Sequence, residues 1–224
     1  MPDFHADENK LTLKVVFYGP ALSGKTTNLM QLHSLLNPER KGELMVLETR
    51  DDRTLFFDML PIGLRGGSGL DLRLKLYTVP GQVQHDSTRK AVLSRADGVV
   101  FVADSQPSQQ DNNATAFGNL EENLEKVGLD IDTLPMVVQF NKRDIPGVVD
   151  EQTLQQRWAP TPWAPLIMAS AIQGTGVIES FRTLLDRLYT AIEGEFSLEL
   201  EHRIDRQTFI NGLSASHGAQ HANL

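Results

Sequence analysis

The chain has 224 residues, 40% of them hydrophobic and 22% charged, and this composition excludes a disordered or fibrous protein. A total of 29 Asp and Glu against 21 Lys and Arg gives a net charge of −8. This balance argues against a dedicated nucleic-acid binder, because such a protein needs a basic face for phosphates. The absence of cysteine excludes disulfides, Cys-based zinc sites, thiolate catalysis and prenyl or palmitoyl anchors.

The N-terminal segment is acidic and lacks an apolar core, so it does not have the pattern of a signal peptide. Pro2 excludes N-terminal myristoylation, and no apolar run approaches the roughly 18 residues that span a bilayer. We therefore expect a cytoplasmic protein with no direct membrane insertion.

Short apolar runs alternate along the chain with segments of helical periodicity. The apolar runs predict strands at 11–18, 44–48, 70–79, 98–103, 136–140 and 166–170. The helical spacing predicts helices at 26–36, 83–95, 113–127 and 177–193. The continuous runs are typical of central parallel strands, whereas strict alternation within 71–76 predicts a strand with one less buried face. Alternating strands and helices indicate a three-layer α/β fold.

Three segments are predicted from this pattern. Residues 1–10 form a flexible N-terminus, residues 11–194 form the α/β domain, and residues 195–224 form a partly disordered C-terminal extension. The stretch 196–213 has the pattern of an amphipathic helix. The extension either packs as an extra helix or binds an effector or a cytoskeletal protein.

The motif G-x-x-x-x-G-K-[ST], typical of a phosphate-binding loop, falls between the first predicted strand and the first predicted helix. It reads Gly19-Pro20-Ala21-Leu22-Ser23-Gly24-Lys25-Thr26. Glycines let backbone N–H groups turn around a polyphosphate, and the helix N-terminus adds its positive dipole end. Lys25 supplies a charge to the outer phosphates, and the Thr26 hydroxyl can ligate Mg²⁺. The candidate contacts are Gly19, Ala21, Leu22, Ser23, Gly24, Lys25, Thr26 and Thr27.

A second motif, Asn141-Lys142-Arg143-Asp144, follows the strand at 136–140. N-K-x-D at the carboxyl end of a strand is the guanine-reading signature of Ras-like GTPases. The Asp144 carboxylate can accept hydrogen bonds from guanine N1–H and the exocyclic amine, and adenine lacks that donor pair. The Lys142 stem can lie along the base. The stretch Ser170-Ala171-Ile172 resembles the S-A-x loop that backs the guanine.

A third motif, Thr78-Val79-Pro80-Gly81-Gln82, stands where Ras-like proteins carry D-x-x-G-Q. Gly81 can offer its N–H to the γ-phosphate, and Gln82 can orient the attacking water. Thr78 replaces the aspartate that usually holds Mg²⁺ through water. Metal contact then depends on Thr26, on a threonine of the first switch, which belongs at residues 48–61, or on an acid that the sequence does not identify.

Taken together, these motifs resemble one family. The order G-P-x-x-x-G-K-T-T-N-L, D-R-T-L-F-F-D, T-V-P-G-Q, F-V-A-D-S and N-K-R-D is similar to that of the bacterial mutual-gliding (MglA-type) GTPases. The resemblance covers residues 10–193, and T-V-P-G-Q is usual in that family. It implies a Ras-like P-loop fold, with a mostly parallel sheet and one antiparallel edge strand, and a small GTPase that binds GTP and GDP with Mg²⁺.

The resemblance also implies roles in the first switch. Thr54 would ligate Mg²⁺ together with Thr26 and would sense the γ-phosphate. Arg53 would act as an arginine finger supplied in cis. Outside the first switch, Gln82 of the third motif would position water, and Lys25 of the phosphate loop would complete the catalytic set. Turnover is implied to be slow alone and faster with a roadblock/LC7-type activating protein. Nucleotide-state-dependent effectors, a role in cell polarity or motility, and recruitment to a cell pole are implied as well.

Two other functions are compatible with the residues. A P-loop ATPase or small kinase shares the phosphate loop, although Asn141, Lys142 and Asp144 argue against it. A pseudo-GTPase, in which the bound nucleotide is only structural, would account for the threonine at position 78 in place of the usual aspartate. The apolar block at 55–60 is a buried edge strand or core segment, or it is a surface that the nucleotide reshapes and a partner binds. Both interpretations hold if the strand shifts register between nucleotide states.

Overall fold

The computed structural model describes residues 2–48, 56–80 and 86–215. The strands in these ranges are β1 (Asp3–His5), β2 (Lys10–Tyr18), β3 (Met45–Glu48), β4 (Phe56–Arg65), β5 (Asp71–Thr78), β6 (Gly98–Asp104), β7 (Met136–Asn141) and β8 (Ile167–Met168). The helices in the same ranges are α1 (Lys25–Leu35), α2 (Asp86–Leu93), α3 (Gln110–Lys126), α4 (Glu151–Trp158), α5 (Val177–Phe196), α6 (Leu198–His202) and α7 (Arg206–Ser214). None of these helices is long and apolar enough to cross a membrane.

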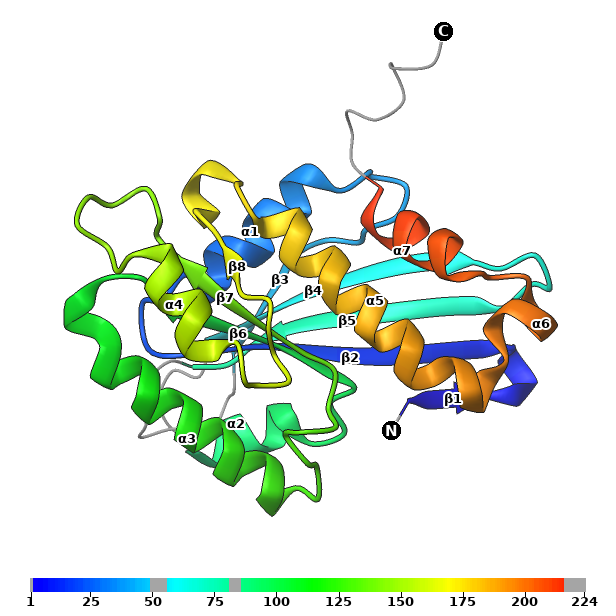
Figure 1. Ribbon diagram of the computed structural model, residues 1–224. Helices are drawn as coiled ribbons and strands as arrows, with labels where there is room; N and C mark the ends of the chain where they lie inside the picture. The colour runs from blue at the N-terminus through cyan, green and yellow to red at the C-terminus, as the bar shows by residue number, and fades with distance from the viewer. Residues whose placement is uncertain (1, 49–55, 81–85, 216–224) are drawn as a thin grey trace, which may run out of the picture.

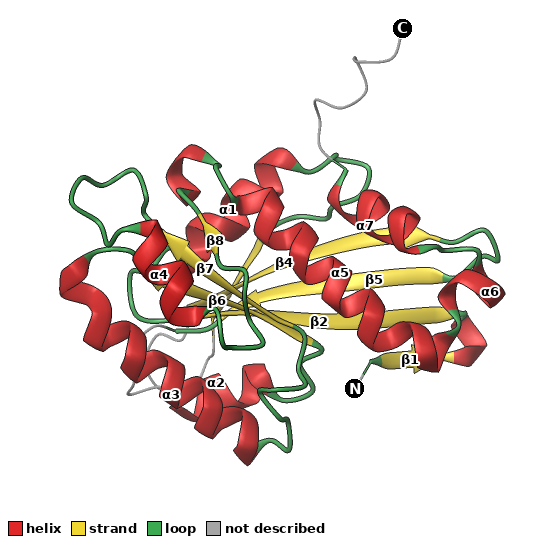
Figure 2. Cartoon of the chain, in the orientation of Figure 1, coloured by secondary structure: helices red, strands yellow, loops and turns green. Residues whose placement is uncertain are grey.

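The described strands form one mixed sheet in the order β3-β4-β5-β2-β6-β7-β8, and β1 pairs with β2 outside this path. Strands β5, β2, β6, β7 and β8 run parallel, whereas β4 is antiparallel to both of its neighbours. Helices α1, α5 and α7 cover one face of the sheet, and α2 and α3 cover the other (Figure 1; Figure 2). The predicted three-layer, mostly parallel α/β fold is confirmed, and its antiparallel strand β4 lies one position in from the edge.

Two hydrophobic clusters fill the spaces between the sheet and its helices. Val15 and Phe17 of β2 belong to the cluster with α1 and α5, while Val16 and Tyr18 belong to the cluster with α2 and α3. This division follows from the alternation of side chains along a strand. Every residue of β6 and β7 is buried, as predicted for central strands, and β5 alternates between buried and less buried residues.

The sequence predicts two elements incompletely. Only the beginning of β4 falls within the apolar block at 55–60, because Pro61 and Gly63 weaken the strand pattern in its second half. Helix α4 lies in a stretch with no predicted element, and Leu154 is its only buried residue. A helix with so narrow an apolar stripe gives little periodic signal.

Both ends of the described chain are more ordered than the sequence predicts. Residues 3–5, expected to be flexible, form β1 antiparallel to β2, and the Phe4 ring packs edge-on against Phe196. The helix predicted at 196–213 is divided into α6 and α7. Leu198, Phe209 and Leu213 are fully buried in the same cluster as the sheet, so the described part of the extension belongs to the domain core.

Candidate functional site

The phosphate loop joins β2 to α1 at the carboxyl ends of the parallel strands. Two of its glycines are required by geometry. Gly19 has φ +144°, and a Cβ there would lie 2.2 Å from the Val102 carbonyl oxygen. Gly24 has φ +100°, and a Cβ there would lie 2.2 Å from Asn141 Nδ2. The backbone can therefore make its tight turn only with glycine at these two positions.

Lys25 is almost completely buried at the start of α1, with 6% of its surface exposed. Its ammonium donates hydrogen bonds to the carbonyl oxygens of Gly19, at 3.0 Å, and Pro20, at 2.7 Å. Burial, together with the nearby charge of Arg89, lowers the pKa of Lys25 to about 7. The phosphate loop thus holds a lysine whose charge is weakly compensated by the protein.

The other predicted phosphate-loop contacts differ in exposure. Leu22 has φ +61° and an exposed side chain, whereas Ser23 is fully buried. The Ser23 hydroxyl has no hydrogen-bond partner in the described chain. Thr26 is exposed in the first turn of α1, beside the buried Lys25, and this position leaves its hydroxyl accessible to a ligand.

Asn141, at the end of β7, connects two of the predicted loops. Its Nδ2 donates to the Ser23 carbonyl oxygen at 2.8 Å, and its Oδ1 accepts from the Ala171 N–H at 2.8 Å. Asp144 lies three residues further on and accepts a hydrogen bond from the Ser170 hydroxyl at 2.5 Å. The structure therefore brings the phosphate loop, the N-K-R-D loop and the 170–172 loop together at one edge of the sheet.

Lys142 and Ile172 complete the base-reading loops. Lys142 has φ +67°, and its ammonium lies 2.7 Å from Asp104 Oδ2. Asp104 is buried at the carboxyl end of β6, one strand away, and was not among the predicted site residues. Its signal in the sequence is an aspartate directly after an apolar strand. Ile172 is largely exposed, whereas Ala171 is buried.

Thr78, which occupies the usual aspartate position, lies beside an acid that the sequence did not identify. The Asp58 backbone N–H donates to Thr78 Oγ1 at 2.9 Å, and Thr78 Oγ1 donates to Asp58 Oδ2 at 3.3 Å. Both residues are buried. The carboxylate missing from the third motif is therefore present on the adjacent antiparallel strand, β4.

The predicted residues Arg53, Thr54, Gly81 and Gln82 lie outside the described residues. Within the described ranges, no three His, Asp or Glu residues gather as a metal site.

A buried polar chain supports the phosphate loop from behind. Gln139 Nε2 donates to Asn28 Oδ1 at 3.0 Å and to Ser180 Oγ at 2.9 Å. Asn28 Nδ2 in turn donates to the Gly24 carbonyl oxygen at 3.0 Å. These bonds fix the first turn of α1 relative to β7 and α5, so the loop is supported from two neighbouring elements.

Arg89 of α2 is fully buried and supports the loop from the opposite side. Its Nε donates to the Pro80 carbonyl oxygen at 3.0 Å, and its Nη1 donates to Asn119 Oδ1 at 2.6 Å. The guanidinium also lies 5.5 Å from the ring centre of Tyr18, the residue before Gly19. One side chain thus connects the third motif with the strand that leads into the phosphate loop.

The parallel sheet, the glycine-rich loop between β2 and α1 and the loops at its carboxyl edge define a Ras-like P-loop fold. No protein-family model matches the chain. The mutual gliding-motility protein MglA of Myxococcus xanthus (strain DK1622) is 41% identical over 184 residues, which cover 82% of this chain and 94% of that protein. The chain therefore belongs to the MglA family of Ras-like proteins.

Proposed function

We propose that this protein is a small GTPase that binds GTP and GDP with Mg²⁺ and works as a molecular switch. The observation that carries the proposal is the Asn141 side chain, which joins the phosphate loop to the 170–172 loop. These two hydrogen bonds support the proposal, because they connect a phosphate-binding loop with a loop that resembles the one backing the guanine.

The phosphate end of the nucleotide is assigned to Lys25 and the N-terminus of α1. The Lys25 ammonium and the backbone N–H groups around Gly24 would bind the β- and γ-phosphates. A bound Mg²⁺ would neutralise charge on these phosphates. Its protein contacts would be the hydroxyl of Thr26 and, through water, the carboxylate of Asp58, because Asp58 lies within hydrogen-bond distance of Thr78.

The base end is assigned to Asp144 and Lys142. The exposed Asp144 carboxylate would accept hydrogen bonds from guanine N1–H and the exocyclic amine, while Ser170 holds one of its oxygens. The Lys142 stem would lie along the base, with its ammonium fixed by Asp104. An adenine would leave the carboxylate without its donor pair, which disfavours binding of ATP.

Hydrolysis is assigned to residues that the family resemblance implies. Arg53 would stabilise charge on the transferring phosphoryl group, Gln82 would orient the attacking water, Gly81 would donate to the γ-phosphate, and Thr54 would complete the metal site. A roadblock/LC7-type partner would accelerate the slow intrinsic reaction. Loss of the γ-phosphate contacts would then change the affinity for effectors and so control polarity or motility, with recruitment to a cell pole through these partners.

The test is GTP hydrolysis by the purified protein with Mg²⁺, alone and with the roadblock-type protein of the same organism. We expect slow turnover that rises strongly with the partner. Lys25→Ala should abolish nucleotide retention, whereas Gln82→Leu and Arg53→Ala should bind GTP normally and lose ~10²-fold or more in turnover. Normal GTP binding by Lys25→Ala would refute the assignment.

The same preparation separates the alternatives. Displacement of labelled GTP by equimolar ATP would indicate a P-loop ATPase or kinase. Tight GTP binding without turnover, and equal partner binding with GDP and a non-hydrolysable GTP analogue, would indicate a pseudo-GTPase. The Asp58 carboxylate beside Thr78 favours the active enzyme, because the acid that Thr78 lacks is supplied from β4.

A further inference from the structure

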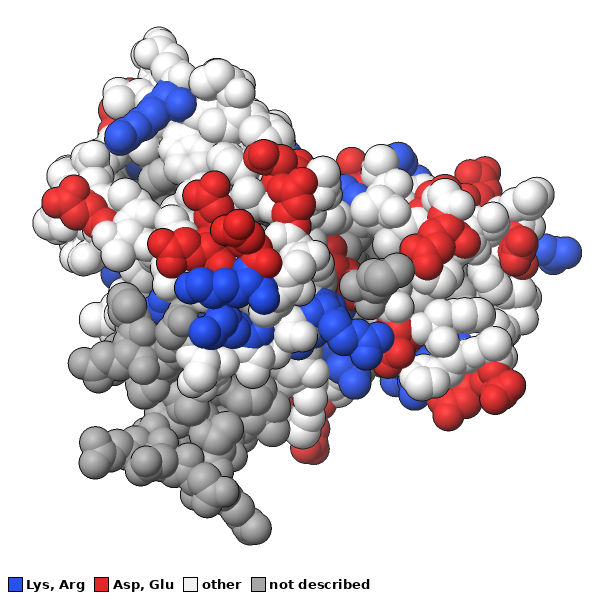
Figure 3. Space-filling model, turned by 90° about the horizontal axis from the view of Figure 1, so that it is seen from below, with Lys and Arg blue, Asp and Glu red and all other residues white. Residues whose placement is uncertain are grey.

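A large cavity opens between α3 and α4, on the sheet face opposite α1 and α5. Its volume is about 580 Å³, within the range of roughly 300–1,000 Å³ that is common for small-molecule sites. Asp104 forms part of its wall, so the cavity adjoins the base-reading loop. Acidic and basic side chains are interspersed over the molecular face seen in Figure 3, and no single charge dominates it.

Aromatic rings form the apolar wall of the cavity. The ring centre of Phe117 lies 5.0 Å from that of Phe101, 5.3 Å from that of Trp158 and 5.0 Å from that of Trp163. Phe140 packs against Trp158 on the same wall. These edge-to-face contacts hold the rings in place, and the resulting surface favours a flat aromatic molecule.

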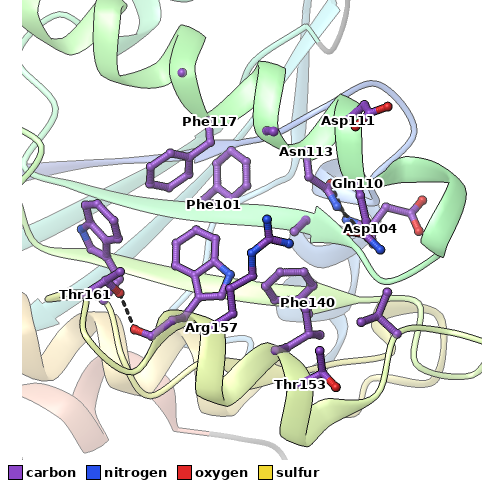
Figure 4. A pocket seen from close by; sticks show the side chains of 17 residues that line it. Phe101, Asp104, Gln110, Asp111, Asn113, Phe117, Phe140, Thr153, Arg157 and Thr161 are labelled. Atoms are coloured by element: carbon purple, nitrogen blue, oxygen red, sulfur yellow. Dashed lines mark hydrogen bonds between the residues drawn. The ribbon is translucent and has the colours of Figure 1, made fainter.

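Arg157 supplies a positive charge at this wall. Its side chain reaches from α4 into the cavity toward Phe101 and Asn113 (Figure 4). The guanidinium makes no hydrogen bond or ion pair with the described part of the chain. A guanidinium beside aromatic rings is well suited to bind a carboxylate, sulfonate or phosphate group.

The two acids of the wall do not cancel this charge. Asp104 is already paired with Lys142, at 2.7 Å, and accepts hydrogen bonds from Gln106. Asp111 and Arg157 are both exposed, but the Asp111 carboxyl group points away from the rings in Figure 4, whereas the Arg157 side chain reaches toward them. The charge that the cavity offers to a ligand is therefore positive.

Gly118 keeps space open in the α3 wall. It lines the cavity in the middle of a 17-residue helix, and a Cβ added there would have no heavy atom within 4 Å. Glycine is unfavourable inside a helix, and here no close contact requires it. Its presence is accounted for if the space beside it is used by a ligand.

We propose that this cavity is a second ligand site, which binds a flat aromatic molecule with one acidic group. The rings of Phe117, Trp158 and Trp163 pack against the aromatic body, and Arg157 binds the acid. The site is separate from the guanine-nucleotide site, although Asp104 lies in the cavity wall and also pairs with Lys142 of the base loop.

The chain contains two tryptophans, and both line the cavity, so intrinsic fluorescence reports directly on it. The probe is anilinonaphthalene sulfonate, an aromatic anion, titrated into full-length protein saturated with GDP so that the nucleotide site is closed to it. We expect saturable binding of one probe per chain with energy transfer from tryptophan. Arg157→Gln should weaken binding by about tenfold or more, given what a hydrogen bond to a charged group contributes.

Gly118→Leu should abolish binding by filling the cavity. The matched control is Gly194→Leu, in α5, where an added Cβ also has no heavy atom within 4 Å and which lies outside the cavity. Circular dichroism with thermal unfolding establishes that each variant is folded. The proposal is overturned if the folded protein shows no saturable binding, or if Gly118→Leu binds the probe as tightly as Gly194→Leu does.

Discussion

GDP binding should be accompanied by proton uptake at Lys25. The pKa of this lysine is lowered to about 7 in the nucleotide-free protein, so at pH 8 most of the molecules carry a neutral amine. A bound polyphosphate favours the ammonium and raises the pKa again. Binding at pH 8 should therefore take up roughly 0.5–1 proton per GDP at Lys25. The terminal phosphate, with a pKa of about 6, is already ionised at this pH and adds little to the uptake.

The assay is isothermal titration calorimetry of GDP binding at pH 8 in two buffers of different ionisation enthalpy. The difference between the two apparent binding enthalpies gives the number of protons taken up. Lys25→Arg keeps a positive charge that does not titrate, so its uptake should fall to near zero. Arg89→Gln, which removes the second cause of the shift, should bind GDP with reduced uptake. Uptake below about 0.2 proton in the unaltered protein would refute the reasoning.

Three substitutions test the rest of the site by nucleotide binding and thermal unfolding, and a fourth, Gly118→Ala, is the control for one of them. Asp144→Asn should lose ~10²-fold or more in GDP affinity and gain affinity for xanthosine diphosphate, because an amide can donate to the carbonyl that xanthine carries. Unchanged selectivity between these two nucleotides would contradict the base assignment. Gly24→Ala places a methyl group 2.2 Å from the Asn141 amide and should cost roughly 1–3 kcal/mol, whereas Gly118→Ala, in open space, should stabilise by about 0.5–1 kcal/mol. Asp104→Asn removes an ion pair with the base loop and should speed GDP release about fivefold, or ~1 kcal/mol.

The parts of the site that could be predicted are the motifs whose residues are contiguous in the sequence. The phosphate loop and the N-K-R-D loop each follow one apolar strand, and parallel strands place their carboxyl ends at one edge of the sheet. Local spacing was therefore enough to bring Lys25 and Asp144 to the same edge. The roles of Arg53 and Gln82 stay predictions, because both residues lie outside the described residues.

The residues that could not be predicted depend on strand pairing. Asp58 reaches Thr78 only because β4 runs antiparallel to β5 in one register, in which Met59 pairs with Tyr77. A shift of one residue would turn the carboxylate to the other face of the sheet. Asp104 likewise reaches Lys142 through the parallel pairing of β6 with β7. No local pattern in the sequence encodes either register.

The C-terminal helix α7 packs against β4, the strand that carries Asp58, and this contact gives the extension a role in the domain. Gly212 of α7 lies so close to β4 that an added Cβ would be 2.6 Å from the Leu64 side chain, and Phe209 beside it is fully buried. Phe209→Ala should lower the free energy of unfolding by about 3–5 kcal/mol, or Tm by roughly 6–20 °C. The exposed Gln207, on the same helix, provides the control Gln207→Ala, which should change neither.

Removal of residues 197–224 extends this test from stability to the site. Without α7 the apolar side of β4 is exposed, and we expect weaker Mg²⁺-dependent retention of GDP together with the lower Tm, because Asp58 depends on the pairing of β4 with β5. A truncated protein with the original Tm and the original GDP release rate would mean that the extension is dispensable to the domain. A lower Tm with unchanged GDP release would mean instead that α7 supports the core without holding Asp58 in place.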